Sequence, residues 1–140
     1  MTKRPACQLP ASRRCPPPAT GTVFGDVPAN SFAAAYIEAL AAAQVTTGCG
    51  SGNYCPDAAV TRDQMAVFLL RTLEGPAYVP PACVTPLFGD VPCTNGFSRW
   101  IDELANRGIT AGCGGGNYCP SGSVSRGQMA VFLSTTFSLP

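Results

Sequence analysis

The stretch Gly48-Cys-Gly-Ser-Gly-Asn-Tyr-Cys-Pro56 occurs again, with one change, as Gly112-Cys-Gly-Gly-Gly-Asn-Tyr-Cys-Pro120, 64 residues further along the chain. The same offset aligns residues 24–69 with residues 88–133 without a gap, and 25 of these 46 positions are identical. Self-similarity at a fixed period is typical of repeated structural modules. The sequence therefore predicts two tandem modules, at residues 24–75 and 88–140. A Pro-rich basic segment, residues 1–23, precedes them, and a Pro-rich connector, residues 76–87, lies between them.

The first helix of each module is predicted from an apolar stripe. Asn30 and Ser31 are residue types that favour a helix N-cap, and an Ala-rich stretch with high helix propensity follows them. In the second module, Gly108 is well placed to end the helix in a left-handed conformation. We expect the buried helix faces to consist of Phe32, Tyr36, Ile37 and Leu40 in the first module, and Trp100, Ile101 and Leu104 in the second.

The second helix of each module has a clear start signal. Thr61 and Ser125 are each followed three residues later by a glutamine, Gln64 or Gln128, and this spacing indicates a capping box. The fold class is therefore mainly α, with tandem helix-loop-helix repeats packed as a bundle and loops closed by disulfides. Apolar residues predict the buried faces of these helices: Met65, Phe68, Leu69 and Leu73, and then Met129, Phe132 and Leu133.

Eight cysteines in 140 residues predict a disulfide framework formed in an oxidising compartment. The short spacings are C-x5-C rather than the CxxC pairs of zinc sites, so we predict no metal site. Repeat symmetry suggests that Cys49 pairs with Cys55 and that Cys113 pairs with Cys119. The pairing of the other four stays open: a Cys83–Cys93 bond would tie the connector to the second module, and a Cys7–Cys15 bond would close a loop in the N-terminal segment.

Composition excludes several classes of function. The chain has no histidine, which removes Ser-His-Asp and Cys-His catalysis and His-ligated metals. A net charge of +1 argues against nucleic acid as the main partner. No run of 18 apolar residues is present, so no membrane span is expected, and the charged start lacks the apolar core of a signal peptide. If the protein is secreted, we expect Met1 to mark a mature or trimmed chain.

Catalysis is the poorest hypothesis for this chain. Its eight carboxylates are spread along the sequence, and the one adjacent pair, Asp102-Glu103, lies on a predicted helix where neighbouring side chains point apart. No nucleophile and base suggest themselves as a pair. We therefore expect no enzyme activity and no cofactor.

The ordered motifs of both modules resemble those of S-layer homology (SLH) repeats. These motifs are Phe-Gly-Asp-Val-Pro at 24–28 and 88–92, an aromatic-Ile-x-x-Leu helix, Tyr-Cys-Pro, and Val-Thr/Ser-Arg-x-Gln-Met-Ala. The resemblance covers residues 24–73 and 88–137. It implies helix-loop-helix units that bind cell-wall polysaccharide non-covalently, usually three to a bundle with ligand grooves between the lobes. It also implies anionic, pyruvylated ligands, contacted partly by the arginine of a Thr-Arg-Ala-Glu motif.

The resemblance suggests candidate ligand-binding residues. The sequence departs from the family pattern in three respects: Gln stands in place of the motif's Glu, the loop is predicted to carry a disulfide, and two repeats are present where three are usual. Residues carried over from the family are the motif's arginines and glutamines, the aspartates of Phe-Gly-Asp and the helix aromatics: Arg62, Arg126, Gln64, Gln128, Asp26, Asp90, Tyr36 and Trp100.

Each candidate also has a structural interpretation. Arginine in the first turn of a helix opposes the macrodipole, so its presence in both repeats suggests either an anion site at free helix amides or pairing with Asp26 or Asp90. The glutamines are expected to cap helices before they contact a ligand. The aspartates are expected to order a turn, and Tyr36 and Trp100 to pack in the core, although aromatic rings also stack on sugars.

Two functional hypotheses remain. The first is a non-catalytic cell-envelope module that binds an anionic cell-wall polysaccharide and anchors its protein outside the bacterial cell, at the surface. The alternative is a structural, self-assembling surface protein whose repeats join between subunits into oligomers, fibres or a lattice, because two lobes of a three-lobed plan leave an apolar flank open.

Overall fold

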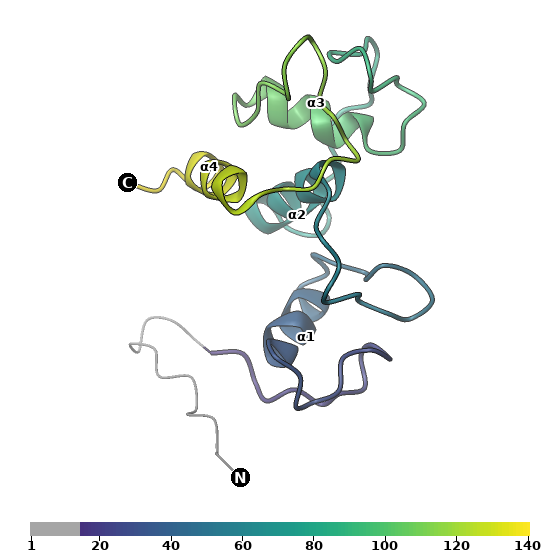
Figure 1. Cartoon of the computed structure of the whole chain (residues 1–140), viewed down its shortest axis with the longest axis vertical. Helices are drawn as coiled ribbons and strands as arrows, with labels where there is room; N and C mark the ends of the chain where they lie inside the picture. The colour runs from purple at the N-terminus through teal and green to yellow at the C-terminus, as the bar shows by residue number, and fades with distance from the viewer. Residues whose placement is uncertain (1–14) are drawn as a thin grey trace. The chain divides into compact units, whose positions relative to one another are not determined.

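A computed structural model describes residues 15–140 of the chain (Figure 1). This part contains four α-helices and no β-strand, which confirms the mainly α fold class. None of its helices has the length and apolar character needed to cross a membrane. The helices are α1 (Ala34–Ala42), α2 (Arg62–Glu74), α3 (Ser98–Asn106) and α4 (Arg126–Thr136).

The helices belong to two compact units whose boundary lies between Pro56 and Asp57. The first unit contains α1 and the Cys loop that follows it, and the second contains α2, α3 and α4. Helix α2 therefore belongs to the first repeat in sequence but packs with the second repeat in structure, against both α3 and α4. The sequence repeat is not the packing unit.

The first unit has a small core, and its helix α1 begins later in the sequence than predicted. Phe24, Val27, Ala34 and Ile37 are buried together. The predicted caps, Asn30 and Ser31, are wrong: Ala33 precedes the helix with a left-handed φ of 60° and makes no side-chain cap. The physical reason is a pair of turns, in which the Ser31 N–H donates to the Pro28 carbonyl at 2.9 Å and the Ala34 N–H donates to the Ser31 carbonyl at 3.2 Å.

The predicted apolar face of α1 is only partly correct. Ile37 is buried and Leu40 is half-buried, as expected. Phe32 is 84% exposed and Tyr36 is 53% exposed, so their predicted burial is wrong. Phe32 precedes the helix, and the helical period therefore does not apply to it.

The second unit contains the larger core. Trp100, Ile101 and Leu104 of α3 are buried, which confirms the predicted face. Gly108 follows α3 with φ of 70° and ends it as predicted. The faces of α2 and α4 depart from prediction at Leu73 and Leu133, which are 40% and 39% exposed. The remaining predicted positions on these two helices, Met65, Phe68, Leu69, Met129 and Phe132, are buried or partly buried.

Both predicted capping boxes start their helices where the sequence places them. The Thr61 N–H donates to Gln64 Oε1 at 3.2 Å, and the Ser125 N–H donates to Gln128 Oε1 at 3.1 Å. In α4 the Gln128 N–H donates back to Ser125 Oγ at 3.2 Å. The expected capping role of both glutamines is confirmed.

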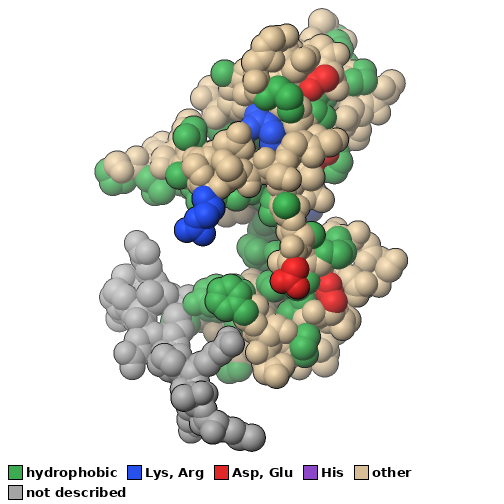
Figure 2. Space-filling view, viewed as in Figure 1, with side chains coloured by type: hydrophobic (Ala, Val, Ile, Leu, Met, Phe, Trp, Pro, Cys, Tyr) green, Lys and Arg blue, Asp and Glu red, His purple; other side chains and the backbone are tan. Residues whose placement is uncertain are grey.

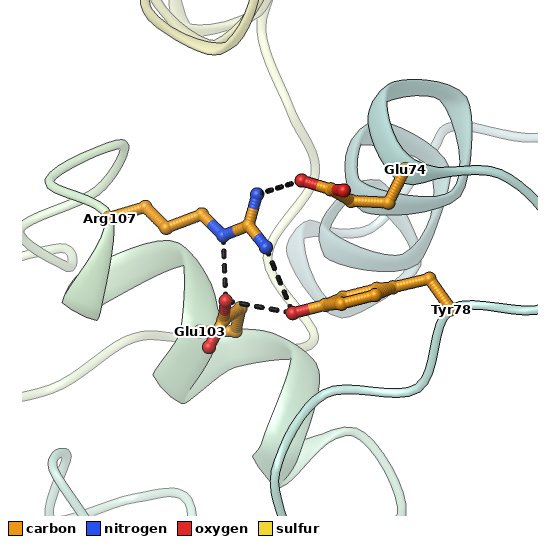
Figure 3. A network of polar contacts seen from close by, with 4 residues as sticks. All are labelled: Glu74, Tyr78, Glu103 and Arg107. Atoms are coloured by element: carbon orange, nitrogen blue, oxygen red, sulfur yellow. Dashed lines mark hydrogen bonds and ion pairs between the residues drawn. The ribbon is translucent and has the colours of Figure 1, made fainter.

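A polar network fixes the end of α2 and the connector against α3 (Figure 3). The Arg107 guanidinium pairs with Glu74 of α2 and, at 2.7 Å, with Glu103 of α3. It also donates to the Tyr78 hydroxyl at 2.9 Å, and this hydroxyl donates to Glu103 at 2.9 Å. Burial opposes ionisation of Glu103, but the hydrogen bonds from Arg107 and Tyr78 outweigh it and lower the pKa of that carboxyl.

Charged groups are otherwise sparse, in keeping with a charged content of 12%. On the face drawn in Figure 2, few side chains are charged and apolar side chains are spread over both units. Among the exposed large apolar residues, Tyr36 lies on α1, and Val131 and Leu133 lie on α4. These exposed residues can contact another molecule.

We predict that Arg107→Met lowers the free energy of unfolding of the second unit by about 1–2 kcal/mol, because it leaves Glu103 and Tyr78 without their charged partner. Trp100, the single tryptophan, lies in the core of that unit, and its fluorescence during urea unfolding measures the change. Arg99→Met, in α3, is the control and should unfold close to wild type. Equal stability of the two variants would contradict the structural role of the network.

Candidate functional site

Each Cys loop is ordered by the aspartate of the Phe-Gly-Asp motif. Asp26 accepts the N–H groups of Tyr54 and Cys55 at 2.8 and 2.7 Å, and Asp90 accepts those of Tyr118 and Cys119 at the same two distances. These backbone hydrogen bonds, first those from Tyr54 and Tyr118, hold the pKa of both carboxyls below its usual value against the effect of desolvation. The expectation that the aspartates order a turn is confirmed.

Disulfides close the same loops. The Cys49–Cys55 and Cys113–Cys119 bonds are present as predicted, each with 6.0 Å between the two Cα atoms. Gly112 begins the second loop with φ of 91°, and a Cβ there would collide with the Asn117 carbonyl oxygen, so glycine is required. The loop is therefore constrained by a covalent bond, a carboxylate and a backbone conformation at once.

Three further cysteines are also disulfide-bonded. Cys83 and Cys93 form a disulfide that ties the connector to the region before α3, which is one of the pairings that the sequence left open. Cys15 is disulfide-bonded too, and its predicted partner, Cys7, lies outside the described residues.

Arg62 lies buried at the contact between α2 and the second Cys loop. Its Nε donates to the Tyr118 carbonyl at 2.8 Å, and its guanidinium carbon lies 4.7 Å from the centre of the Tyr118 ring. The Tyr118 hydroxyl donates back to the Arg62 carbonyl at 2.8 Å. Burial raises the pKa of Tyr118 to about 12, although the positive charge of Arg62 opposes this shift. Arg62 and Tyr118 thus hold each other by three distinct contacts.

The N-terminus of α2 is covered by backbone carbonyls. The Arg62 N–H donates to Gly122 at 2.9 Å, and the Asp63 N–H donates to Pro120 at 3.0 Å. The prediction of an anion site at free amides is therefore wrong for α2, because the loop supplies the acceptors. The alternative of an Arg62–Asp90 ion pair is not seen among the described residues either. Arg62 influences the pKa of Asp90 only through its charge.

The N-terminus of α4 differs from that of α2 although its motif is nearly the same. Arg126 is exposed, and within residues 15–140 the N–H groups of Arg126 and Gly127 find no acceptor. Gly127 also replaces Asp63, so α4 lacks the carboxylate that lies at the start of α2. A helix N-terminus with free amides and an adjacent guanidinium is a site for anions. At α4 the anion site stays a prediction.

The two helix aromatics are placed differently. Trp100 is buried in the core of the second unit, as expected, with the Arg71 guanidinium 5.6 Å from its ring. Tyr36 is about half exposed on α1, so its ring remains accessible to a ligand or a protein. Asp26 and Tyr36 belong to the first unit, and the other six predicted site residues belong to the second.

Sequence reasoning missed the role of Tyr118. The signal was present, because Asn-Tyr occurs at the same place in both Cys loops. Sequence reasoning also missed a cavity of about 220 Å³ between the connector and α3, which Asp102 and Arg99 help to line. None of the predicted ligand-binding residues lines that cavity.

Comparisons with known proteins agree with the motifs. A family model described as the S-layer homology domain matches residues 23–66 and 98–130. Among curated proteins, the chain is similar to an uncharacterized cell wall amidase of Bacillus anthracis, with 31% identity over 113 residues. The alignment covers 76% of this chain and 20% of that protein. The chain therefore spans about a fifth of the length of the curated relative it matches.

We predict that acid destabilises the second unit partly through Asp90. Its folded-state pKa is lower than its ordinary value, so the unfolded chain binds the proton more tightly, and the stabilisation fades as pH falls through about 4 and below. Asp90→Asn removes one charged acceptor and should flatten the dependence of the urea midpoint on acidic pH, measured by Trp100 fluorescence. Asp57→Asn changes an exposed aspartate and should keep the wild-type slope. A wild-type slope in Asp90→Asn would contradict the assignment.

Proposed function

Because this chain belongs to the S-layer homology domain family, we propose that it is a non-catalytic module that binds an anionic cell-wall polysaccharide. Domains of this family anchor proteins to the cell wall, which supports a location of the chain at the cell surface or envelope. The curated relative is named as a cell wall amidase, and the chain aligns with only a fifth of it. We infer that this chain attaches and does not itself cleave the wall.

The observation that carries the proposal is the open N-terminus of α4. Arg126 is exposed there beside two backbone N–H groups that have no acceptor among the described residues. A carboxylate can take a bidentate hydrogen bond from the guanidinium and also meet the positive end of the helix dipole. A pyruvyl group on a polysaccharide presents one such carboxylate per substituted sugar. Gln128 is exposed as well, and its amide nitrogen remains available after its oxygen caps the helix.

The first unit offers a different kind of contact. Phe32 and Tyr36 expose aromatic surface on and just before α1. Aromatic faces stack on the apolar faces of sugar rings, so this surface can add affinity for a glycan without recognising its charge. Arg62 is buried under the second Cys loop and is assigned a structural role in this proposal.

A structural, self-assembling role is the second candidate. It is favoured by apolar surface on α4, where Val131 is 61% exposed and Leu133 is 39% exposed. Val131 and Leu133 flank the buried Phe132, and exposed apolar surface is what contact with another chain would cover.

Purified wall sacculi test the leading proposal in a sedimentation assay. Arg126→Ala should weaken binding by about 10- to 100-fold, since it removes a charge-assisted bidentate contact. Chemical removal of pyruvate from the sacculi should weaken binding by wild type to a similar degree. Arg99→Ala is the control for a lost positive charge and should bind as wild type does.

Two results would contradict this mechanism. Binding of Arg126→Ala at wild-type strength would exclude the α4 terminus as the anion site. Undiminished binding of wild type to pyruvate-free sacculi would exclude the pyruvyl carboxylate as the recognised group. Arg62→Ala is unsuitable for this comparison because loss of a buried side chain would destabilise the second unit.

A further inference from the structure

The two repeats join through a contact that the chain makes between its own segments. One half of the contact is α2, with Arg62, Ala66 and Leu69 buried. The other half is the second Cys loop together with α3, which contribute Tyr118 and Trp100. The surfaces fit each other, since Tyr118 and Ala66 have no exposed surface.

Helix α4 repeats the contact residues of α2, but no described segment buries them. The three positions that correspond to the buried residues of α2 have the same residue types. All three are exposed, and Leu133 is 39% exposed where its counterpart is 3% exposed. Position by position, Arg62, Ala66 and Leu69 correspond to Arg126, Ala130 and Leu133.

The first unit carries the second half of the contact, also incompletely covered. Its Cys loop has the same build, since the Phe24 and Tyr54 rings lie 5.4 Å apart, as do those of Phe88 and Tyr118. Tyr54 is only partly buried, and its hydroxyl makes no hydrogen bond to another described residue. Tyr36, which occupies the place of Trp100, is about half exposed.

We propose that α4 of one copy docks on the Tyr54 loop and α1 of a second copy, in the same way that α2 packs on the Tyr118 loop and α3. The occupant is a second copy because the chain itself supplies both complementary surfaces, with the side chains that already fit each other within it. The interface is heterologous, with a different surface on each partner, so it forms head-to-tail chains or rings.

Docking would cover Arg126, as the second Cys loop covers Arg62. It therefore competes with binding of an anion at the α4 terminus. Self-association is independent of the proposed wall binding when it is measured with no wall material present. The two proposals can then fail separately.

Sedimentation velocity of the oxidised chain over a wide range of concentration tests the docking. Wild type should form species that grow with concentration. Ala130→Glu places a charge in the proposed interface and should weaken association by more than about tenfold. Because Ala130 is exposed and glutamate favours helix, this variant should keep wild-type helix content by circular dichroism. The matched control, Val84→Glu, changes a residue of the connector that is 92% exposed and should associate as wild type does.

Mixing two variants gives the decisive result. Ala130→Glu retains an intact Tyr54 loop, and Tyr36→Lys retains an intact α4. Each should be monomeric alone, and together they should form a dimer that contains one of each, because a single intact interface is restored. Wild type that stays monomeric at every concentration overturns the proposal. So does association that Ala130→Glu leaves unchanged, or a mixture that forms no heterodimer.

Discussion

The pairing of Arg62 with Tyr118 is the interaction on which the second unit depends. A guanidinium removed from water is costly unless its hydrogen-bonding groups and its charge find partners. Here the Tyr118 carbonyl accepts from Nε, the ring lies against the guanidinium, and the Tyr118 hydroxyl returns a hydrogen bond to the Arg62 carbonyl. These contacts place the start of α2 on the Cys loop of the other repeat. The burial of Ala66 and Leu69 and the packing of α2 between α3 and α4 follow from that placement.

The same residue has opposite environments in the two repeats. Arg62 is buried and satisfied, whereas Arg126 is exposed at a helix end whose first amides lack acceptors among the described residues. The local motif is nearly the same in both, so the difference arises from what covers each helix. A repeat protein stabilises its modules through neighbouring modules, and among the described residues α2 has such a cover whereas α4 does not. The environment of each arginine is therefore set by what packs on its helix and not by the motif alone.

Local signals predicted the parts of the structure that are fixed by residues close in sequence. Both capping boxes, the C-x5-C disulfides and the turn-ordering aspartates follow from spacing and repeat symmetry. The predicted start of α1 is wrong because backbone turns after Pro28 compete with a side-chain cap. The partner of α2 could not be predicted, since periodicity shows that a helix has an apolar face but does not show which segment covers it. For the same reason, the sequence could not predict that the second Cys loop buries Arg62.

The second Cys loop presents to α2 what an anion would present to a free helix. Three of its carbonyl oxygens, from Tyr118, Pro120 and Gly122, accept from the Arg62 side chain and from the first two amides of the helix. The disulfide, Asp90 and Gly112 hold this loop in place and so fix the positions of these oxygens. Our two proposals assign the corresponding donors at α4 two kinds of partner: a carboxylate or a carbonyl-rich loop. The fold satisfies these donors internally at α2, whereas the first two amides of α4 have no acceptor among the described residues.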